Sequence, residues 1–535
     1  MYISDSDFMR VFNLVYYFSK EYCKFLLQHK NQLRKKAMLV VLLFCSLLAS
    51  SAASNILVIA PSLSPSLLIA MGRVADTLAG TGRHFVTMWI PEMNLLQMNG
   101  SNLAHRIIHM KNISNAFQRL NEEMPELFDN AANSFWSRLL LDDAELEWCE
   151  AVLKRRSELD QLRTAQFDLV YFNMEDLCFF GISHYLNISQ KALVITGPIP
   201  DQYNWFLGIP QPLSIVPSMQ ESVMVGPRMN ILMRALNVWQ YGQAIIAQWR
   251  LYRQENAIFR RHISPDFPSL EQLASRIDIA FVFGDEFVDP SYPTLSKVIP
   301  IGGIGISKTP NKLKQHFLRA IVSAPSGAVL FSLGSIADTR NLDKRKLANL
   351  FNAFAHFSDY AFLVKVGVSD EFSREMIGNV PNIHLFEWLP QTDILSHPSL
   401  RLFISHCGYN SVLESAIHAV PILGIPLFFD QLRVAKSAEY RGFARILTKS
   451  DLSHVERIIE EIGEMLDNPK YKASARRLSK LHREKPNAPD VQLIRWSEFL
   501  LANGPLPEYF FDNCCNCFWH CLAMPKSYCV DLDKN

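Results

Sequence analysis

Short apolar runs alternate with segments of helical periodicity along most of the chain. The first run, Asn55–Ala60, is followed by helical spacing from Leu67 to Leu78 and by a second run, Phe85–Ile90. A strand, a helix and a strand at this spacing predict a βαβ unit with buried parallel strands. The stretch Leu103–Leu162 has helical spacing and no strand signal. Further strands are predicted at Phe167–Phe172 and Ala192–Thr196.

A glycine-rich segment, Pro300–Gly305, separates this series from a second one. It follows an apolar strand and suits a hinge, so we expect one domain over residues 54–299 and another over 300–489. The second series predicts strands at Ala328–Ser332, Ala361–Val366, Ile383–Phe386, Leu400–Ser405 and Val420–Ile425. It predicts helices at Lys344–Phe357, Ser411–His418 and Val434–Tyr440. The alternation indicates an α/β fold with two consecutive doubly wound, Rossmann-like domains.

The composition is that of a globular protein. A chain of 535 residues is too long for one ordinary core, and 49% hydrophobic with 20% charged residues excludes a disordered chain. The formal net charge of +1 argues against a general nucleic-acid binder, because such proteins carry a strong basic excess.

Residues 38–53 have the features of a secretory signal peptide in the usual order. Basic residues at 34–36 precede an apolar run from Met38 to Leu48, and small residues follow at Ala49–Ser54. Residues 1–37 are an unusually long leader, so we expect translation to start at Met38 or the extension to be an artefact of the gene model. An uncleaved signal anchor is the alternative.

Three N-glycosylation sequons agree with a chain that enters the secretory pathway. They lie at Asn99, Asn112 and Asn187, although each is weak alone because such triplets arise by chance. With the signal peptide they predict a glycoprotein of the endoplasmic reticulum lumen or the secretory pathway.

The cysteines do not form a framework for the main fold. A Cys149–Cys178 bridge is conceivable, but the sequence does not establish it. The last segment is rich in cysteine, and Cys514, Cys517, His520 and Cys521 can be drawn as a zinc site with a non-standard spacing. We favour an aberrant or alternative exon end.

Two loops have the composition of anion-binding turns. Phe331–Ser335 closes a strand with small residues, and Gly334 allows an anion to approach the backbone, although the same residues suit a plain turn. In Leu402–Glu414 an apolar strand leads into His406, with a helix expected to begin near residue 410 or 411. A helix N-terminus there favours a diphosphate. Ser411 and Glu414 also match an S-x-x-E capping box.

Two further loops carry groups suited to a nucleotide sugar. Pro426–Gln431 ends a strand in a carboxylate and an amide, which can hold sugar hydroxyls. Trp388–Gln391 offers an aromatic face and an amide edge for a flat uracil ring, although a lone tryptophan is more often part of a core. In a Rossmann-like domain, all four loops converge at one edge of the sheet.

These four blocks and their spacing resemble the signature of the UDP-glycosyltransferases. The match is closest to the UDP-glucuronosyltransferase-like enzymes of animals, and the His-Cys-Gly at 406–408 has an invertebrate character. The resemblance runs from about residue 55 to 500 and is strongest after Pro300. It implies the GT-B fold, with two Rossmann-like domains, the donor bound by the second and the acceptor by the first.

The resemblance assigns donor-site roles to particular residues. Trp388 would stack on uracil, Gln391 would contact the nucleoside and Glu414 would hold the ribose hydroxyls. The groups expected to hold the diphosphate or the sugar are Gly334, Ser335, His406, Gly408, Asn410, Asp430 and Gln431.

The resemblance implies no cofactor and no metal ion, because helix dipole and amides neutralise the departing UDP. The D-x-D matches at residues 5–7 and 531–533 lie in the terminal segments, and we discount them as metal ligands.

The catalytic pair of the family is not matched. The resemblance places a histidine base shortly after the first strand, where this chain has Leu67, and a partner carboxylate where it has Asn173. Leucine cannot accept a proton. A shift of register would bring in Glu175 or Asp176 as a substitute for the acid, and His84 is a weak substitute for the base.

The C-terminus also departs from the family. A helix over residues 490–504 is expected to pack back on the first domain, but residues 505–535 form an atypical tail in place of the family's membrane-spanning helix. No run there approaches the roughly 20 apolar residues that a span requires.

Three functions remain open from the sequence. The first is inverting, metal-independent transfer of glucuronic acid or glucose from a UDP-sugar to a small lipophilic alcohol or phenol. The second is a catalytically impaired relative that binds UDP-sugar or associates with active transferases, as Leu67 and Asn173 favour. The third is a GT-B enzyme with a protein or lipid acceptor. Homo- or hetero-oligomers with related transferases are compatible with each.

Overall fold

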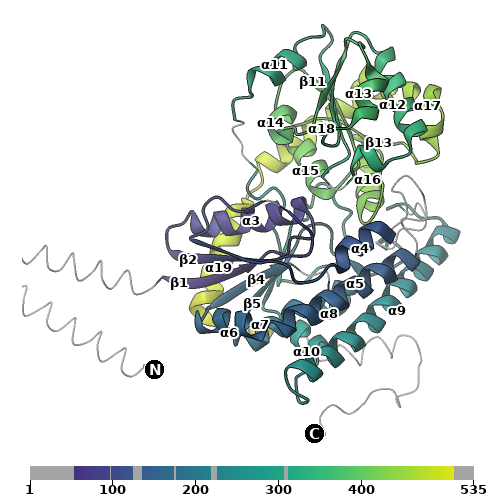
Figure 1. The fold of residues 1–535 in the computed structure, drawn as a ribbon. Coiled ribbons are helices and arrows are strands. Elements are labelled where there is room, and N and C mark those ends of the chain that lie inside the picture. Colours follow the sequence, from purple (N-terminus) through teal and green to yellow (C-terminus); the bar gives the residue numbers. More distant parts are fainter. Residues whose placement is uncertain are drawn as a thin grey trace, which may run out of the picture. The chain divides into compact units, whose positions relative to one another are not determined.

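The computed structural model describes residues 53–96, 98–123, 135–173, 176–218, 226–306, 311–335 and 337–510. The leader, the signal-peptide run, the Cys-rich cluster with its drawn zinc site and both D-x-D matches lie outside these residues, as does Glu175. From Asn55 onward the chain forms one compact unit (Figure 1).

The first domain is built on a seven-stranded sheet. Parallel pairs join β2 to β3, β1 to β4, and β4 through β7 in succession. The strand order β3-β2-β1-β4-β5-β6-β7 reverses direction between β1 and β4, so the loops after these two strands lie side by side. The strands are β1 Ser54–Ile59, β2 His84–Pro91, β3 Arg106–Met110, β4 Leu169–Asn173, β5 Gln190–Ile195, β6 Ile279–Val282 and β7 Val298–Pro300.

The prediction that Leu103–Leu162 contains no strand is wrong at β3. This strand lies at the edge of the sheet, and of its five residues only Met110 is buried. An edge strand covers little of the core, so its sequence, Arg-Ile-Ile-His-Met, lacks the long apolar run of the central strands.

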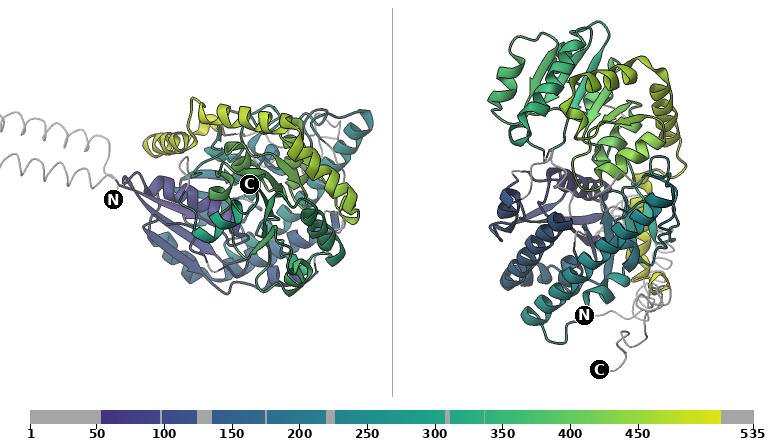
Figure 2. Two further views of the ribbon diagram at one scale, coloured as in Figure 1. Left: turned by 90° about the horizontal axis from the view of Figure 1, so that it is seen from above. Right: turned by 90° about the vertical axis from the view of Figure 1, so that its right-hand side faces the viewer.

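Helices cover both faces of the first sheet (Figures 1 and 2). The helix that follows β1 begins after Ser64, whose hydroxyl accepts a 3.2 Å hydrogen bond from the Leu67 amide. A disulfide between Cys149 and Cys178, with Cα atoms 6.1 Å apart, joins two of the helices. The helices are α3 Pro65–Ala79, α4 Ala116–Glu123, α5 Phe135–Lys154, α6 Arg156–Thr164, α7 Cys178–Tyr185, α8 Asp201–Leu207, α9 Ile231–His262 and α10 Leu270–Ser275.

The second domain has a six-stranded parallel sheet, with strand order β10-β9-β8-β11-β12-β13. Here the order reverses between β8 and β11, which places the loops after these strands together. The strands are β8 Ala328–Ser332, β9 Ala361–Lys365, β10 Ile383–Phe386, β11 Leu400–Ser405, β12 Ile422–Gly424 and β13 Ala444–Ile446. The helices are α11 Gln315–Ile321, α12 Lys344–His356, α13 Glu371–Ile377, α14 Gln391–Leu395, α15 Tyr409–Ile417, α16 Gln431–Tyr440, α17 Val455–Asp467 and α18 Pro469–Arg483.

The last long helix, α19 Pro489–Asn503, returns to the first domain and packs against α3 and β7. The hydroxyl groups of Tyr171 on β4 and Ser497 on α19 are hydrogen-bonded. Among the described residues, no helix is both long and apolar enough to cross a bilayer. The sequon residues Asn99, Asn112 and Asn187 are exposed.

Candidate active site

The residues predicted to bind the donor lie on loops and helices that follow strands of the second sheet, at its carboxyl edge. A Cβ added to Gly334 would lie 2.6 Å from His406 Nε2, and one added to Gly408 would lie 2.5 Å from the same atom. The imidazole is therefore held between the loops after β8 and β11, and neither glycine position has room for a side chain. Gly334 also has a φ of +85°, which a residue with a Cβ rarely adopts.

The electrostatics of this point keep His406 neutral. The pKa of His406 is lowered to about 4, mainly by burial; a backbone hydrogen bond with Ser332 opposes the shift and the charge of Lys365 adds to it. Lys365 ends β9 and its ammonium donates a 2.6 Å hydrogen bond to the Gly334 carbonyl. A neutral imidazole and a fixed ammonium therefore flank the loop after β8 at pH 7.

The helix that follows His406 begins earlier than expected. Gly408 is the N-cap of α15 and no side chain caps this end, so the first amides of the helix have no side-chain partner from the cap residue. The predicted capping box of Ser411 and Glu414 is wrong, because both lie inside the helix. The uncapped N-terminus beside His406 has the geometry of an anion site.

Glu414 lies at the centre of a buried polar contact. Its Oε2 accepts a 2.9 Å hydrogen bond from Gln391 Nε2, and its Oε1 forms a 3.0 Å ion pair with Arg73 Nη2 from α3 of the first domain. The amide of Gln391 also lies 3.2 Å from Ser411 Oγ. A carboxylate can accept about four hydrogen bonds, so these contacts leave capacity for ribose hydroxyls.

Three other residues that are predicted to bind the donor lie at the same edge and are at least partly exposed to solvent. Trp388 follows β10 and is 60% exposed, so its ring is not part of the core. Ser335 follows Gly334 and is exposed, and Asn410 is half-buried in the first turn of α15. An exposed indole at a strand end is free to stack on a base.

Asp430 and Gln431 lie where α16 begins. Burial raises the pKa of Asp430 to about 6, with the negative charge of Asp289 adding to the shift and Arg433 opposing it. A Cβ added to Gly197, just after β5, would lie 3.2 Å from Asp430 Oδ2, so this carboxylate faces the first domain. Gln431 Oε1 accepts hydrogen bonds from the amides of Leu427 (2.8 Å) and Phe428 (3.2 Å), which fix the loop.

The structure adds a polar network that the sequence motifs did not reveal. Tyr409 is buried, and its hydroxyl donates to Asp289 Oδ2 (2.8 Å) and accepts from the Asp285 amide (2.7 Å). His482 and Lys485 bind Asp285 at 3.0 Å and 3.2 Å. Tyr409 adjoins the His-Cys-Gly motif, the one signal in the sequence that could have pointed to it, whereas Asp289 lies 120 residues from Tyr409 and Arg73 lies 341 residues from Glu414.

Leu67 cannot act as the base. It is the third residue of α3, only 5% exposed, and its side chain belongs to the apolar core between α3 and the sheet. Asn173 is the last residue of β4 and is buried. Its Nδ2 donates a 2.9 Å hydrogen bond to the Val194 carbonyl. Its Oδ1 is buried without a hydrogen-bond partner.

Asp176, the predicted substitute for the missing acid, is held elsewhere. It is buried, its Oδ1 accepts from the Cys178 amide at 3.0 Å, and its charge interacts with the other buried carboxylates Asp142 and Glu255. Burial raises its pKa to about 7. The structure therefore assigns Asp176 to the packing of α5, α7 and α9.

This raised pKa predicts a pH dependence of stability. The folded-state pKa of Asp176 lies above the ordinary value of 3.8, so the contribution is full below about pH 4 and is lost as the pH rises to about 7. Asp176→Asn removes this loss, so the melting temperature of the variant should exceed that of the wild type at pH 8, and the gap should shrink toward pH 4. Thermal unfolding across this range measures it. Asp266→Asn, at an exposed site, is the control and should show no such trend.

His84, the weak substitute for the base, is also misplaced for that role. It begins β2, at the amino edge of the sheet, whereas the site lies at the carboxyl edge. Burial lowers its pKa, and Glu498 of α19 and Arg83 are its charged neighbours. The distance from the carboxyl edge, set by the length of β2, excludes it as the base.

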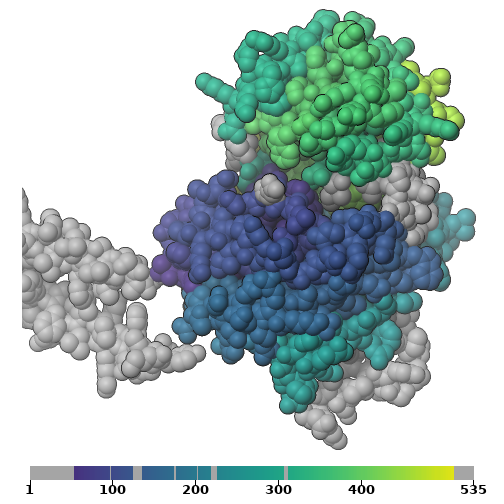
Figure 3. Space-filling model, viewed as in Figure 1, coloured from purple at the N-terminus to yellow at the C-terminus, as the bar shows by residue number. Residues whose placement is uncertain are grey.

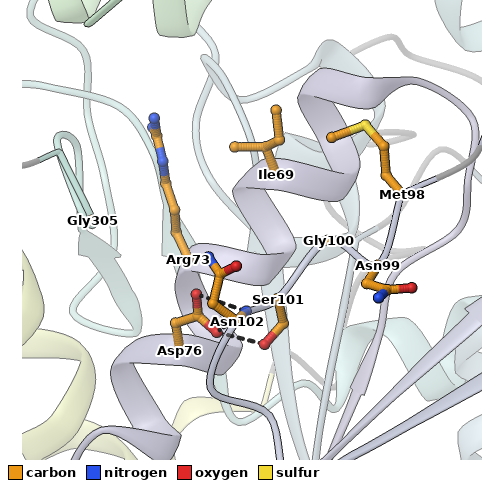
Figure 4. Close-up of a pocket in the computed structure, with 9 residues that line it drawn as sticks. All are labelled: Ile69, Arg73, Asp76, Met98, Asn99, Gly100, Ser101, Asn102 and Gly305. Atoms are coloured by element: carbon orange, nitrogen blue, oxygen red, sulfur yellow. Dashed lines mark hydrogen bonds between the residues drawn. The ribbon is translucent and has the colours of Figure 1, made fainter. Parts of the chain in front are cut away.

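A cavity of about 500 Å³ lies beside α3 (Figure 4). Its wall includes Arg73 and Asp76 of α3, the loop from Met98 to Asn102, and Gly305. Asp76 fixes that loop by accepting from Ser101 Oγ and from the Asn102 amide. Arg73 also forms the ion pair with Glu414, and it extends away from Asp76 in the close-up. The cavity contains no predicted donor residue. Within the described ranges, no group of three or more His, Cys, Asp or Glu side chains is arranged to hold a metal ion.

Comparison with known proteins assigns this arrangement to a family. The model of the UDP-glucuronosyl and UDP-glucosyl transferase family matches residues 54–504. The chain belongs to the UDP-glycosyltransferases. It is therefore a glycosyltransferase by family, and the donor of this family is a UDP-sugar.

Animal relatives of this UDP-glycosyltransferase cover most of its length. The ugt-48 protein of Caenorhabditis elegans, whose name assigns it to the UDP-glucuronosyltransferases, is 31% identical over 89% of this chain and 91% of its own. UDP-glucuronosyltransferase 3A1 of Bos taurus is 29% identical over 66% of each chain. The predicted resemblance to animal enzymes of this family is confirmed.

Solved structures confirm the GT-B fold. A UGT2 of Phytolacca americana, solved with UDP-2-fluoroglucose and pterostilbene, has a TM-score of 0.55 at 18% identity, covering 83% of this chain and 98% of its own. The spinosyn rhamnosyltransferase SpnG has a TM-score of 0.55 at 16% identity, covering 83% of this chain and all of its own. The two parallel sheets of the UDP-glycosyltransferase correspond to the two Rossmann-like domains of that fold.

Proposed function

We propose that this protein transfers glucuronic acid or glucose from its UDP-sugar to a small lipophilic alcohol or phenol, with inversion at the anomeric carbon and without a metal ion. One observation carries the proposal: Asp430, expected to bind the sugar, faces Gly197 at the carboxyl end of β5. A sugar held by Asp430 would therefore lie where the strands of the acceptor domain end, within reach of an acceptor bound there.

The donor half supports departure of UDP. The uncapped N-terminus of α15, beside His406, offers backbone amide donors to the diphosphate as negative charge develops on it. Glu414, Gln391 and Trp388 would hold the ribose and uracil and fix the geometry of the reacting bond.

The acceptor half supports only slow proton removal. Leu67 has no basic group, and Asn173 donates its amide to a carbonyl and cannot polarise a base. A positioned base contributes about 10²–10⁴ in rate, so the enzyme would favour acceptors that are already acidic, such as phenols.

The absence of a basic side chain at position 67 supports a second candidate, a catalytically impaired relative that binds UDP-sugar. The side chain of Leu67, which has no basic group, is packed in the core under α3 at the position where the family resemblance places the base. The two candidates differ in turnover and agree on donor binding.

The test combines UDP release with calorimetric donor binding. The chain would be incubated with UDP-glucuronic acid or UDP-glucose and a panel of phenols and alcohols. Acceptor-dependent UDP release that is lost in Asp430→Ala, while UDP itself still binds, is the expected result. Donor binding without release would select the impaired relative. Absence of donor binding would contradict both.

We also propose that the protein acts in the endoplasmic reticulum lumen or secretory pathway. The signal-peptide pattern at residues 38–53 and the three exposed sequons support this. Glycosidase treatment should change the electrophoretic mobility of the protein if Asn112 or Asn187 carries a glycan. The Asn→Gln variant at the glycosylated site should lose this change.

A further inference from the structure

The outer face of α9 carries more exposed apolar surface than an ordinary water-exposed helix does. Six large apolar side chains on the face turned to solvent are between 54% and 78% exposed, with the exposed Arg234 among them. Gly242 lies on the same side, and a Cβ added there would meet nothing within 4 Å. The exposed apolar residues are Ile231, Leu232, Val238, Trp239, Ile246 and Trp249.

The buried face of this helix is mixed: Leu251, Ile258 and Phe259 enter the core, and polar side chains are buried beside them. Asn237, Gln248 and Glu255 are at most 4% exposed and each has partners inside the domain. Asn237 binds the Ser218 amide and the carbonyls of residues 213 and 216, and Glu255 accepts from the Leu177 amide. A helix in water buries its apolar side and exposes its polar side, so the outer face of α9 is built for another environment.

The charges on α9 indicate which environment that is. Its 32 residues include five arginines and one acidic residue, Glu255, which is fully buried. Arg253 and Arg260 continue the outer face after the apolar part and are exposed. The acidic neighbours on α5 are already paired, Asp143 with Arg250 and Glu150 with His262.

Helices that bind to a membrane surface typically carry tryptophan and arginine beside a row of aliphatic side chains. The indole rings lie among headgroups, the aliphatic side chains enter the acyl boundary and the arginines contact phosphate. Arg253 stacks over the Trp249 ring at 4.7 Å, and Trp136 adds a third exposed indole on the neighbouring α5. Helices α5 and α9 lie side by side on the outside of the first domain (Figures 2 and 3).

We propose that the outer face of α9 docks the first domain on a phospholipid surface, with its aliphatic and indole side chains in the interface and its arginines on the phosphates. The helix lies along the bilayer and does not cross it, because its other face is buried in the domain, through the hydrogen bonds of Asn237 and Glu255 and the core contacts of Phe259. Docking would hold the acceptor domain at the place where lipophilic molecules dissolve. This consequence rests on the proposed function, whereas the docking itself does not.

Vesicle flotation tests the proposal with the whole chain. We expect wild-type protein to float with vesicles of phosphatidylcholine, more so when phosphatidylserine is added, and brominated phosphatidylcholine to quench its tryptophan fluorescence. Trp239→Glu combined with Trp249→Glu should lower partitioning at least about tenfold. The apolar run at residues 38–48 is common to every variant, so it cannot produce the difference.

A matched control separates the α9 face from exposed apolar surface in general. Val322 and Val368, 63% and 60% exposed on the second domain, are replaced by Glu in a second double variant, which should float like the wild type. Both double variants should keep the wild-type melting temperature and UDP binding. Equal flotation of the α9 variant and the wild type would overturn the proposal. So would a wild-type oligomer that the α9 variant dissociates, since the face would then bind protein.

Discussion

Replacing Leu67 by histidine is expected to raise acceptor-dependent UDP release by about 10²–10⁴-fold, the contribution of a positioned general base. Leu67 is in the first turn of α3, after the strand β1 that adjoins β4, so its position is at the carboxyl edge where the acceptor should lie. Burial at this position lowers the pKa of an imidazole below its ordinary value of about 6.5, so the gain in kcat/KM should be lost as the pH falls through that lowered pKa.

The substitution has a structural cost, which the control must match. Burying an imidazole in place of leucine is expected to lower stability by about 1–3 kcal/mol, because the ring loses hydrogen bonds with water. Leu67→Gln has similar size and polarity but no base, and should show a similar loss of stability without the gain in rate. Equal rates in the two variants, or a gain that does not depend on pH, would contradict a base at this position.

Restoring the carboxylate of the catalytic pair, by Asn173→Asp, is expected to raise the rate of UDP release less than the histidine variant does. Asn173→Asp would place a carboxylate against the Val194 carbonyl, to which the amide now donates, and would replace a hydrogen bond with repulsion. The single histidine variant is therefore the sharper experiment.

Replacing Glu414 by alanine is expected to weaken UDP binding by at least about 10²-fold. Each ribose hydroxyl bound to this carboxylate would contribute about 1.5–3 kcal/mol, and both are lost together. The variant also leaves Arg73 without its 3.0 Å ion-pair partner, so the melting temperature should fall as well. Titration calorimetry with UDP measures the first effect and thermal unfolding the second.

Arg73→Met separates the two consequences. It breaks the same ion pair and should also lower the melting temperature, but it leaves the carboxylate in place and should keep UDP binding within about threefold. If both variants lost UDP binding equally, Glu414 would act by joining the domains and not by holding the ribose. If Glu414→Ala bound UDP like the wild type, the assignment of the ribose site would be wrong.

The sequence by itself determined the class of fold and which loops follow the strands of the second sheet at its carboxyl edge. Central parallel strands are buried on both faces, so Leu402–Ser405 or Ala328–Ser332 show as apolar runs that need no tertiary information. Because such strands end at one edge, the loops that follow them could be placed together in advance. The edge strand β3 was not predicted, because only one of its residues is buried and its sequence therefore has no apolar run.

Only the tertiary structure decided which residues distant in sequence complete the site and which faces meet water. Arg73 and Glu414 are 341 positions apart, and no local pattern records their pairing. The start of α15 was set by the loop around His406 and not by the capping box. In α9 the apolar positions repeat as in a core-facing helix, yet they face outward. The loop at residues 213–218 and the Leu177 amide offer partners to Asn237 and Glu255, and those buried hydrogen bonds orient the helix.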